Sequence, residues 1–464
     1  MRNMLVTKTK IIATIGPSTN KYNDLKSLHS AGMNVARINM SHASHADAIS
    51  VVESIRRLNK KQSNLFGPIG ILLDTQGPEI RTGINQSDID LQTGDVVNLT
   101  IRDDIDVETS SIKINYKGLI KSVAKGSKIS IDNGLLNFQV LAKDKENLKC
   151  KVLDGGKLGS KRHVNLPGVR VDLPSITKKD RKDINFGIKH NVSFIALSFV
   201  RSAKDVLTLR SILKRKKSPI KIIAKIENQE GLDNIHEITQ AADIVMVARG
   251  DLGIETDLAD LPNIQRRIMY ASAKWGRRSI VATHLLESMI NHPTPTRAEV
   301  TDVANAIYEG SDAVMLSGET SIGKYPVQCI KMIKEIASKT EHFRTLGYEK
   351  FLQDHSDWQN IAKGARDLAV RVNADAIVII TRSGQTANVV SNTKPFRMPI
   401  YAFTNNRDTF HQLSLIGGMQ PRFIKSITNQ STTISRIKSI LNSEKKAKKS
   451  LKFVFIAGIY SASH

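Results

Sequence analysis

Short runs rich in Ile, Val and Ala recur along the first two thirds of the chain, and a longer segment of helical periodicity follows each of them. Eight such runs lie at 9–16, 34–40, 70–75, 194–200, 221–227, 243–249, 279–285 and 312–318. Apolar and polar residues do not alternate within these runs, which is typical of parallel strands that helices cover on both faces. Eight strand-then-helix units predict a closed (β/α)8 TIM barrel, in which the chemistry gathers at the C-terminal ends of the strands.

The third and fourth runs are separated by many more residues than a barrel loop needs. Within this gap, residues 84–168 contain short alternating runs, such as DVVNLTI from 95 and KISID from 128, divided by Gly, Asn and Asp. The pattern predicts an inserted small β domain, and the barrel then consists of residues 1–83 and 169–340. Pro78 and the segment 167–174 are the expected hinges. The insert is either a mobile lid that excludes water or a passive insertion.

The pattern changes after residue 340. Residues 341–464 alternate helical and strand-like segments, with strands expected at 375–381, 399–404 and 452–458 and an amphipathic helix at 357–372. This order predicts a C-terminal domain with an open α/β sheet. The loop TRSGQT at 381–386 lies between a strand and a helix, so hydroxyls of Thr381, Ser383 and Thr386 could hold an effector phosphate, although most such turns bind nothing.

Polar residues mark the predicted C-terminal ends of the barrel strands. They are Arg37, Asn39, Asp74, Lys225, Glu227, Arg249, Asp251, Thr283 and Glu319. Glu227 and Asp251 end neighbouring strands, and two hard carboxylate ligands suit Mg²⁺ with its other positions open to water and substrate. A salt bridge to Lys225 is the plain alternative. A lysine beside a metal-bound anion suits both phosphoryl transfer and enolate stabilisation.

Three further groups extend this predicted site. Arg37 would face a phosphate, and the amides near Gly250, Asp251 and Leu252 could hold a substrate carboxylate at a helix N-terminus. Thr283 could orient a group or relay a proton, or be structural. A second oxygen cluster carries one formal charge and therefore suits a monovalent cation. Its members are Asn39, Ser41, Asp74 and Thr75.

Composition and charge narrow the class of protein. With 464 residues, 40% of them hydrophobic and 24% charged, the chain is an ordinary globular one, and its net charge of +24 favours anionic partners. The basic runs at 214–217 and 445–449 lack interleaved aromatic residues, which argues against a stacking platform for single-stranded nucleic acid. Cys150 and Cys329 cannot form a disulfide framework, and neither a signal peptide nor a membrane span is apparent. We therefore expect a cytoplasmic protein.

Eight stretches, in order, resemble the successive signatures of the pyruvate kinase family. They are TKIIATIGPST, GMNVARINMSH, LLDTQGPEIRTG, IIAKIENQEGLDN, DIVMVARGDLGIE, ATHLLESMI, PTRAEVTDVANAI and DAVMLSGET. The resemblance implies a three-domain (β/α)8 enzyme that transfers the phosphoryl group of phosphoenolpyruvate to ADP and protonates the enolate to pyruvate, in the last step of glycolysis. It also implies Mg²⁺ or Mn²⁺, K⁺ and a homotetramer.

The resemblance assigns roles residue by residue. Glu227 and Asp251 become Mg²⁺ ligands, the second oxygen cluster binds K⁺, and Lys225 stabilises the phosphoryl group and enolate. The remaining assignments are Arg37 at the phosphoryl group, Thr283 near the enolate carbon, Ser317 and Glu319 in a proton relay, His42, Arg81 and Lys179 on the nucleotide side, and Asp132 in the insert.

Several positions depart from the family pattern or modify it. His284 stands where relatives usually have Gln, and Asn133 where many have Asp. Relatives commonly continue past IAGIYSASH through a PGTTN-like segment; if that segment completes an effector site, the resemblance gives no support for allosteric control. Glu79 stands where relatives without a monovalent ion tend to carry Lys, so it predicts K⁺ dependence, unless it merely pairs with a neighbouring arginine.

Two other functions remain open. One is another (β/α)8 enzyme that stabilises a pyruvate enolate on Mg²⁺ without a nucleotide; Arg81, Lys225 and the insert argue against it. The other is a basic nucleic-acid-binding protein with a vestigial barrel. The complete ring of acids and bases argues against it, and nucleic acid is not a required partner.

Overall fold

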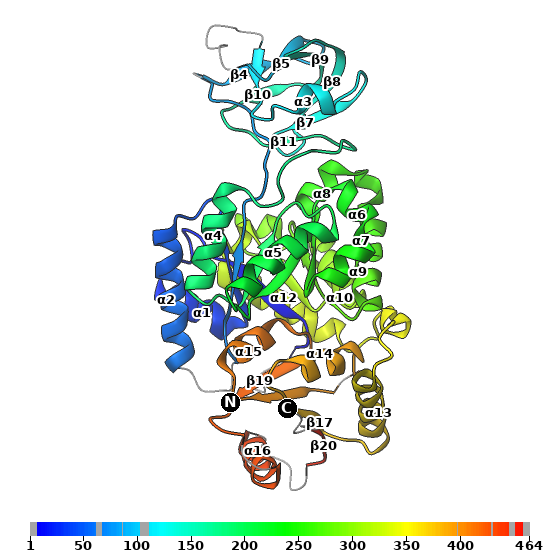
Figure 1. Ribbon diagram of the computed structural model, residues 1–464. Helices are drawn as coiled ribbons and strands as arrows, with labels where there is room; N and C mark the ends of the chain where they lie inside the picture. Colours follow the sequence, from blue (N-terminus) through cyan, green and yellow to red (C-terminus); the bar gives the residue numbers. More distant parts are fainter. Residues whose placement is uncertain are drawn as a thin grey trace.

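The structure is a computed structural model that describes residues 7–61, 67–85, 87–102, 111–396, 398–427, 430–444 and 451–457. The basic run at 445–449 and the segment after residue 457 lie outside the described residues. A barrel occupies the middle of the molecule, a β-rich insert lies at one end and a C-terminal sheet domain lies at the other (Figure 1).

Eight parallel strands close into a barrel in the order β1-β16-β15-β14-β13-β12-β3-β2. They are β1 (Lys10–Thr14), β2 (Val35–Asn39), β3 (Gly70–Asp74), β12 (Phe194–Leu197), β13 (Lys221–Ile226), β14 (Ile244–Ala248), β15 (Arg278–Ala282) and β16 (Ala313–Leu316). Seven of the described barrel strands lie within a predicted run and β15 begins one residue before its run, because strands buried on both faces need continuous apolar sequence. The predicted fold class is confirmed.

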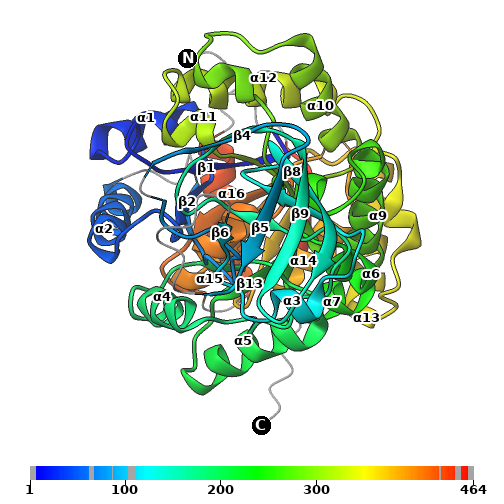
Figure 2. The ribbon, with the colours of Figure 1, turned by 90° about the horizontal axis from the view of Figure 1, so that it is seen from above.

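Helices surround this barrel as a ring (Figure 2). They are α1 (Tyr22–Ala31), α2 (His45–Lys61), α4 (Lys178–Lys189), α5 (Ala203–Arg215), α6 (Gln229–Asp233), α7 (Ile235–Ala241), α8 (Arg249–Glu255), α9 (Leu261–Lys274), α10 (Arg297–Tyr308), α11 (Gly318–Ser321) and α12 (Pro326–Thr340), with 3-10 turns η2 (Leu258–Asp260), η3 (Glu287–Ile290) and η4 (Tyr348–Phe351). Thr177 with Asp180 forms a capping box at the start of α4, and Thr296 with Glu299 forms one at the start of α10. The exposed basic residues 214–217 form the end of α5 and the turn after it.

The insert has its own sheets and its own apolar core. Its elements are β4 (Ile89–Leu91), β5 (Val96–Thr100), β6 (Ser111–Lys113), α3 (Leu119–Ser122), β7 (Lys128–Ile131), β8 (Leu136–Lys143), β9 (Asn147–Asp154), β10 (Gly156–Leu158) and β11 (Val164–Asn165). Among the described residues of the insert, the short helix α3 departs from the expected β-only pattern. Seen from above, β5, β8 and β9 lie over the middle of the barrel (Figure 2).

The C-terminal domain is an open parallel sheet in the order β19-β18-β17-β20. It contains α13 (Asp357–Arg371), β17 (Ala376–Ile380), α14 (Gln385–Asn392), β18 (Ile400–Thr404), α15 (Arg407–Gln412), η5 (Leu413–Leu415), β19 (Met419–Phe423), α16 (Gln430–Glu444) and β20 (Phe453–Ala457). The sequence analysis missed β19. Its sequence MQPRF contains Pro421 and two polar residues, and such a strand is tolerated because β19 pairs only with β18 among the described strands.

The C-terminal domain closes the floor of the barrel, at the N-terminal ends of the strands. Leu415 belongs to the apolar cluster inside the barrel, with Phe194 and Met315 among its members. We call Leu415 the plug of the barrel. The buried Lys10 also contacts the C-terminal domain, since its Nζ donates to the Met419 carbonyl at 2.5 Å. The barrel interior is therefore completed by a side chain from another domain.

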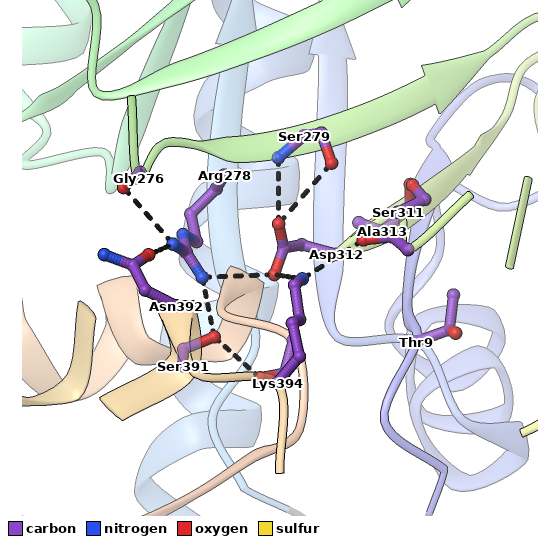
Figure 3. A network of polar contacts seen from close by, with 12 residues as sticks. Thr9, Gly276, Arg278, Ser279, Ser311, Asp312, Ala313, Ser391, Asn392 and Lys394 are labelled. Atoms are coloured by element: carbon purple, nitrogen blue, oxygen red, sulfur yellow. Dashed lines mark hydrogen bonds and ion pairs between the residues drawn. The ribbon is translucent and has the colours of Figure 1, made fainter. Parts of the chain in front are cut away.

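A polar network beside this plug joins the barrel to α14 (Figure 3). Asp312 pairs with Arg278 at 3.3 Å and with Lys394 at 2.9 Å. Arg278 also donates to Ser391 at 2.6 Å and to Asn392, both at the end of α14. Burial disfavours the charge on Asp312, but Lys394 and Arg278 outweigh it and lower the pKa of its carboxyl. Asp312 is therefore held by two cations, and the neutral side chains of Ser391 and Asn392 accept further hydrogen bonds from Arg278.

Within the part of the chain that the structure describes, none of the helices combines the length and the apolar character needed to cross a bilayer.

Candidate active site

Lys225 occupies the centre of the predicted ring. Its Nζ lies 2.8 Å from Glu227 Oε1, 3.4 Å from Asp74 Oδ1 and 2.8 Å from Ser198 Oγ. The ammonium is buried, and although burial disfavours its charge, Asp74 and Glu227 outweigh this effect and raise the pKa of Lys225. The salt bridge of Lys225 with Glu227, which the sequence left open as the alternative to a metal pair, is therefore present. Ser198, which no sequence argument selected, holds the ammonium from a third side.

Arg37 binds the same aspartate from the opposite direction. Its Nε and Nη2 approach Asp74 Oδ2 at 2.8 and 2.7 Å, and its Nη1 donates to Thr14 at 2.9 Å. Burial raises the pKa of Asp74, but Lys225 and Arg37 together outweigh it and hold the pKa below its ordinary value. Asp74 thus fixes two cationic side chains side by side, which is an arrangement suited to an anionic substrate.

Glu227 and Asp251 form the proposed metal pair. Burial raises the pKa of Glu227 to about 7 although Lys225 opposes this, and the negative charge of Asp251 raises it further. Burial also raises the pKa of Asp251, as do the charges of Glu79 and Asp74, against Lys225. Two carboxylates that disfavour each other's ionisation in a buried site provide a strong electrostatic attraction for a divalent cation.

The number of carboxylates, two, fits the binding of a divalent cation. Among the described residues, no group of three or more His, Cys, Asp and Glu side chains could form an all-protein metal cage. Mg²⁺ is commonly bound through one or two carboxylates with its remaining positions left to water and substrate oxygens. Glu227 is further oriented by the Phe199 amide, which donates to its Oε2 at 2.6 Å. Phe199 adopts φ of 53°, an uncommon conformation for this residue, to make that contact.

The α8 helix and the end of β15 meet at Gly250. A Cβ at this glycine would lie 3.1 Å from the Thr283 methyl group, so the close approach favours glycine there. Helix α8 starts at Arg249 with Ala248 as its N-cap and no side-chain cap bond. The expected binding of a substrate carboxylate by the first amides of this helix stays a prediction.

Arg249 is a residue whose role the sequence did not show. Its guanidinium donates to the carbonyls of Ala282, Thr283 and His284, with Nη2 at 2.6 Å from Thr283 O. Thr283 and His284 both have positive φ, at 75° and 54°, which is strained for a β-branched threonine. Asp302 orients the guanidinium at 2.7 Å. Arg249 therefore stabilises the strained turn that presents Thr283.

Ser317 and Glu319 lie at the end of β16. Glu319 is fully buried, and its two oxygens accept from the amides of Leu286 at 3.1 Å and Ser317 at 2.7 Å. These bonds tie the loops after β15 and β16 together. The geometry supports a positioning role for Glu319, while the expected proton relay stays a prediction.

The second oxygen cluster also lies together at strand ends. The Asn39 side-chain oxygen accepts from the Ser41 amide at 3.2 Å, and Thr75 donates from Oγ1 to the Ala196 carbonyl at 3.1 Å. Asp74 contributes the single formal charge, although both of its oxygens face cationic side chains. The K⁺ assignment stays a prediction.

The predicted nucleotide residues have internal partners. Lys179 contacts Asp183 at 2.8 Å and the Met40 carbonyl at 2.5 Å, while His42 is exposed. Arg81 pairs with Glu79 at 2.7 Å and donates to the Lys161 carbonyl at 2.7 Å. The contact between Glu79 and Arg81 is the alternative that the sequence analysis left open for Glu79.

The remaining predicted positions lie in the insert and the C-terminal domain. Asp132 and Asn133 form the left-handed turn between β7 and β8, with φ of 55° and 56°, a conformation that Asn and Asp both tolerate. In the TRSGQT loop, Thr381 is buried and accepts from the Gly384 amide at 3.0 Å, whereas Ser383 is exposed. Thr386 lies buried in the first turn of α14.

Comparisons with known proteins agree with this geometry. Residues 6–330 match the sequence model of the pyruvate kinase barrel domain, and residues 359–464 match that of the pyruvate kinase alpha/beta domain. Pyruvate kinase from Staphylococcus aureus strain MRSA252 is 43% identical over 423 residues, which is 89% of this chain and 71% of the relative, and the protein of strain USA300 is equally similar. A crystal structure of a pyruvate kinase from Cryptosporidium parvum has a TM-score of 0.93 and 36% identity over 98% of this chain and 94% of that one. The chain belongs to the pyruvate kinase family of glycolytic phosphotransferases.

Proposed function

We propose that the chain transfers the phosphoryl group of phosphoenolpyruvate to ADP and protonates the resulting enolate to pyruvate. The observation that carries this proposal is the buried Lys225, which is held between Asp74 and Glu227 near the partly exposed carboxylate of Asp251. Transfer of a phosphoryl group depends mainly on positioning and on positive charge around the transferred group.

Lys225 and Arg37 would face the phosphoryl oxygens. Both cations are fixed in place by Asp74, so little reorganisation is needed when charge moves from the phosphoryl group to the enolate oxygen. The first amides of α8 would hold the substrate carboxylate, which fixes the carbon skeleton against Thr283. Thr283 would then present its hydroxyl near the carbon that accepts the proton.

The Mg²⁺ or Mn²⁺ would be held by Glu227 and Asp251. When bound, the ion supplies Lewis-acid charge to oxygens of the substrate. A bound divalent ion would offset the charge of Asp251, which raises the pKa of Glu227 in the protein without a metal. Asn39, Ser41, Asp74 and Thr75 would hold K⁺ beside the phosphoryl group.

His42, Arg81 and Lys179 would receive the nucleotide, and the insert, with Asp132, would close over it. Closure requires Arg81 and Lys179 to exchange contacts, because both are bound to protein groups in the structure. The insert is proposed to act as a lid at residues 84–168, on a barrel of residues 1–83 and 169–340, with residues 341–464 as a regulatory domain. We place the working enzyme in the cytoplasm, where glycolytic substrates occur.

A homotetramer is supported by exposed apolar side chains. Seven of them lie on η4, on α13 and in the segments next to these elements: Phe343, Leu346, Phe351, Ile361, Leu368, Val370 and Val372. Exposed apolar side chains that gather in one part of the chain are typical of protein interfaces. Sedimentation velocity at micromolar concentration should give the mass of four chains.

The decisive test of the function is a coupled assay for pyruvate with phosphoenolpyruvate and ADP, from which Mg²⁺ and K⁺ are omitted in turn. Turnover should need the nucleotide and the divalent ion. Pyruvate released without ADP would instead favour a metal-dependent enolate enzyme that uses no nucleotide.

The K⁺ dependence is tested with Glu79→Lys, whose ammonium would stand in for the monovalent cation. Wild type should be nearly inactive without K⁺ or NH₄⁺, and the variant should retain activity and lose most of its response to KCl. Ionic strength is matched with tetramethylammonium chloride, since a protein of charge +24 also responds to screening. A Glu79→Lys variant that still requires KCl would show that Glu79 only pairs with Arg81.

A further inference from the structure

The base of the insert contacts the barrel through helix α8. His163 Nδ1 lies 3.6 Å from Asp251 Oδ1, and Asn165 Nδ2 donates to Glu255 Oε1 at 2.9 Å. The Leu166 amide donates to the same Glu255 oxygen at 3.3 Å. Two side-chain contacts therefore join the segment that contains β11 to helix α8, which carries the proposed metal ligand Asp251.

The spacing of these contacts follows from the two backbones. Asp251 and Glu255 are four residues apart, so they lie on one face of α8, one turn from each other. His163 and Asn165 are two residues apart at β11, so their side chains leave the strand on the same side. A helix face and a strand face thus match at two points, and a shift of β11 along α8 would break both contacts.

A second anchor holds the other end of the same hinge segment. Arg201 donates to the Val171 carbonyl and, at 2.5 Å, to the Leu173 carbonyl, and it is oriented by Asp205, whose Oδ2 accepts from the Arg201 amide at 2.9 Å. Between the two anchors the segment passes Gly168, with φ of 71°. It borders a cavity of about 120 Å³ between the insert and the barrel rim.

The two anchors differ in strength. Arg201 binds two backbone carbonyls through a charged guanidinium, whereas Glu255 is held by one amide side chain and one longer backbone bond. Charge-assisted bonds to both carbonyls make the Arg201 end a fixed pivot. The Glu255 end is the part that can release when the insert turns.

We propose that Glu255 is a positioning residue that couples the orientation of the insert to the position of Asp251 on α8. This inference rests on the proposed function, because it takes Asp251 as a metal ligand. With Asn165 bound to Glu255, α8 is held against β11 and Asp251 faces His163. Release of Asn165 frees the insert to turn on Arg201 and lets α8 adjust its metal ligand.

The test uses full-length variants Glu255→Ala, Asn165→Ala and the double variant, with Glu255→Gln as the conservative form that keeps an acceptor oxygen. Two quantities are measured without substrate. One is the affinity for Mn²⁺, followed by its electron paramagnetic resonance signal. The other is the distribution of distances between spin labels on Leu135→Cys in the insert and Leu207→Cys on α5, two exposed positions. Cys150 and Cys329 are buried, so they do not compete for the label.

Each alanine variant should broaden the distance distribution and weaken Mn²⁺ binding about fivefold. The double variant should be no worse than Glu255→Ala, because that variant already removes the Asn165 contact together with the Leu166 bond. Glu255→Gln should stay close to wild type. Glu230→Ala is the matched control, since Glu230 lines the same cavity and makes no side-chain bond to the insert in the described contacts. Its two readouts should not change.

Three outcomes would overturn the proposal: an unchanged distance distribution in Glu255→Ala, an unchanged Mn²⁺ affinity alongside a broadened distribution, or additive effects in the double variant. Failure of the proposed function is recognised separately. Asp251→Asn would then leave Mn²⁺ affinity at the wild-type value, whereas the label distances would still decide whether Glu255 holds the insert.

Discussion

Glu227 is expected to make the metal-free protein less stable, and Glu227→Gln should reverse this effect. Burial raises the pKa of Glu227 from 4.5 to about 7 in the folded protein. The folded state therefore binds more protons than the unfolded state between these values. Stability falls as the pH rises through this window, and the full cost is present above about pH 7.

The magnitude follows from the difference between the two pKa values. About 2.5 pH units at 1.36 kcal/mol each correspond to about 3 kcal/mol at pH 8. A glutamine mimics the protonated form and accepts the Phe199 amide, but its own amide group then faces the Lys225 ammonium. This unfavourable dipole reduces the gain, so we expect Glu227→Gln to stabilise the metal-free fold by about 1–3 kcal/mol at pH 8.

The assay is scanning calorimetry in EDTA at pH 5 and pH 8. Glu227→Gln should raise the melting temperature by a few degrees at pH 8 and by much less at pH 5. Added Mg²⁺ should stabilise wild type and leave the variant nearly unaffected, because one of two ligands has lost its charge. Activity of the variant should require far more Mg²⁺.

Asp312→Asn is the matched control with the opposite sign. Its carboxylate is also fully buried, but Lys394 and Arg278 lower its pKa, so its charge stabilises the fold. The asparagine variant should therefore melt at a lower temperature at pH 8. Equal or lower stability of Glu227→Gln, beside a destabilised Asp312→Asn, would refute the electrostatic account of the metal pair.

Three further predictions concern single residues. Lys225→Met should lower kcat by several orders of magnitude with little change in the affinity for phosphoenolpyruvate. It should also lower the free energy of unfolding by about 3–5 kcal/mol, because Asp74 and Glu227 lose a buried partner. Near-normal turnover would exclude the assigned role. Arg249→Lys should lower kcat about tenfold at unchanged Mg²⁺ affinity, since a single ammonium cannot hold the carbonyls of the strained turn. If the TRSGQT loop binds an effector phosphate, a sugar phosphate should sharpen the response of wild type but not of Ser383→Asp to phosphoenolpyruvate, and a flat response in both would leave the loop as a turn.

The barrel could be predicted from sequence because a strand covered by helices on both faces must be apolar throughout. The same rule located the site, since residues at the ends of parallel strands share one face. The rule of continuous apolar runs did not identify β19, because Pro421 and Arg422 interrupt the apolar pattern of this edge strand. The pairing of β19 with β18 depends on a fold that only the whole domain defines.

The details of the site depended on backbone conformations that the sequence does not reveal. Thr283 is a residue type that disfavours positive φ, so the turn around it, and the need for Arg249 beneath it, had no local signal. Ser198 did have one, as a polar residue inside the apolar run 194–200, and it could have been selected on that ground. Arg81 and Lys179 were selected, but the sequence could not show which internal partners hold them.

The plug formed by Leu415 makes the two accessory domains differ as modules for protein engineering. The insert has a separate core, and the two segments that connect it to the barrel meet in an antiparallel bridge between Arg81 and His163, so its ends are close enough to be joined by a tight turn. We therefore expect that the insert can be exchanged as one unit between related enzymes. The C-terminal domain has no such freedom, because cutting the chain behind α12 would remove Leu415 from the barrel floor and open the strand interior to water. Chimeras of this enzyme should therefore keep the barrel and its floor from one parent and vary the insert.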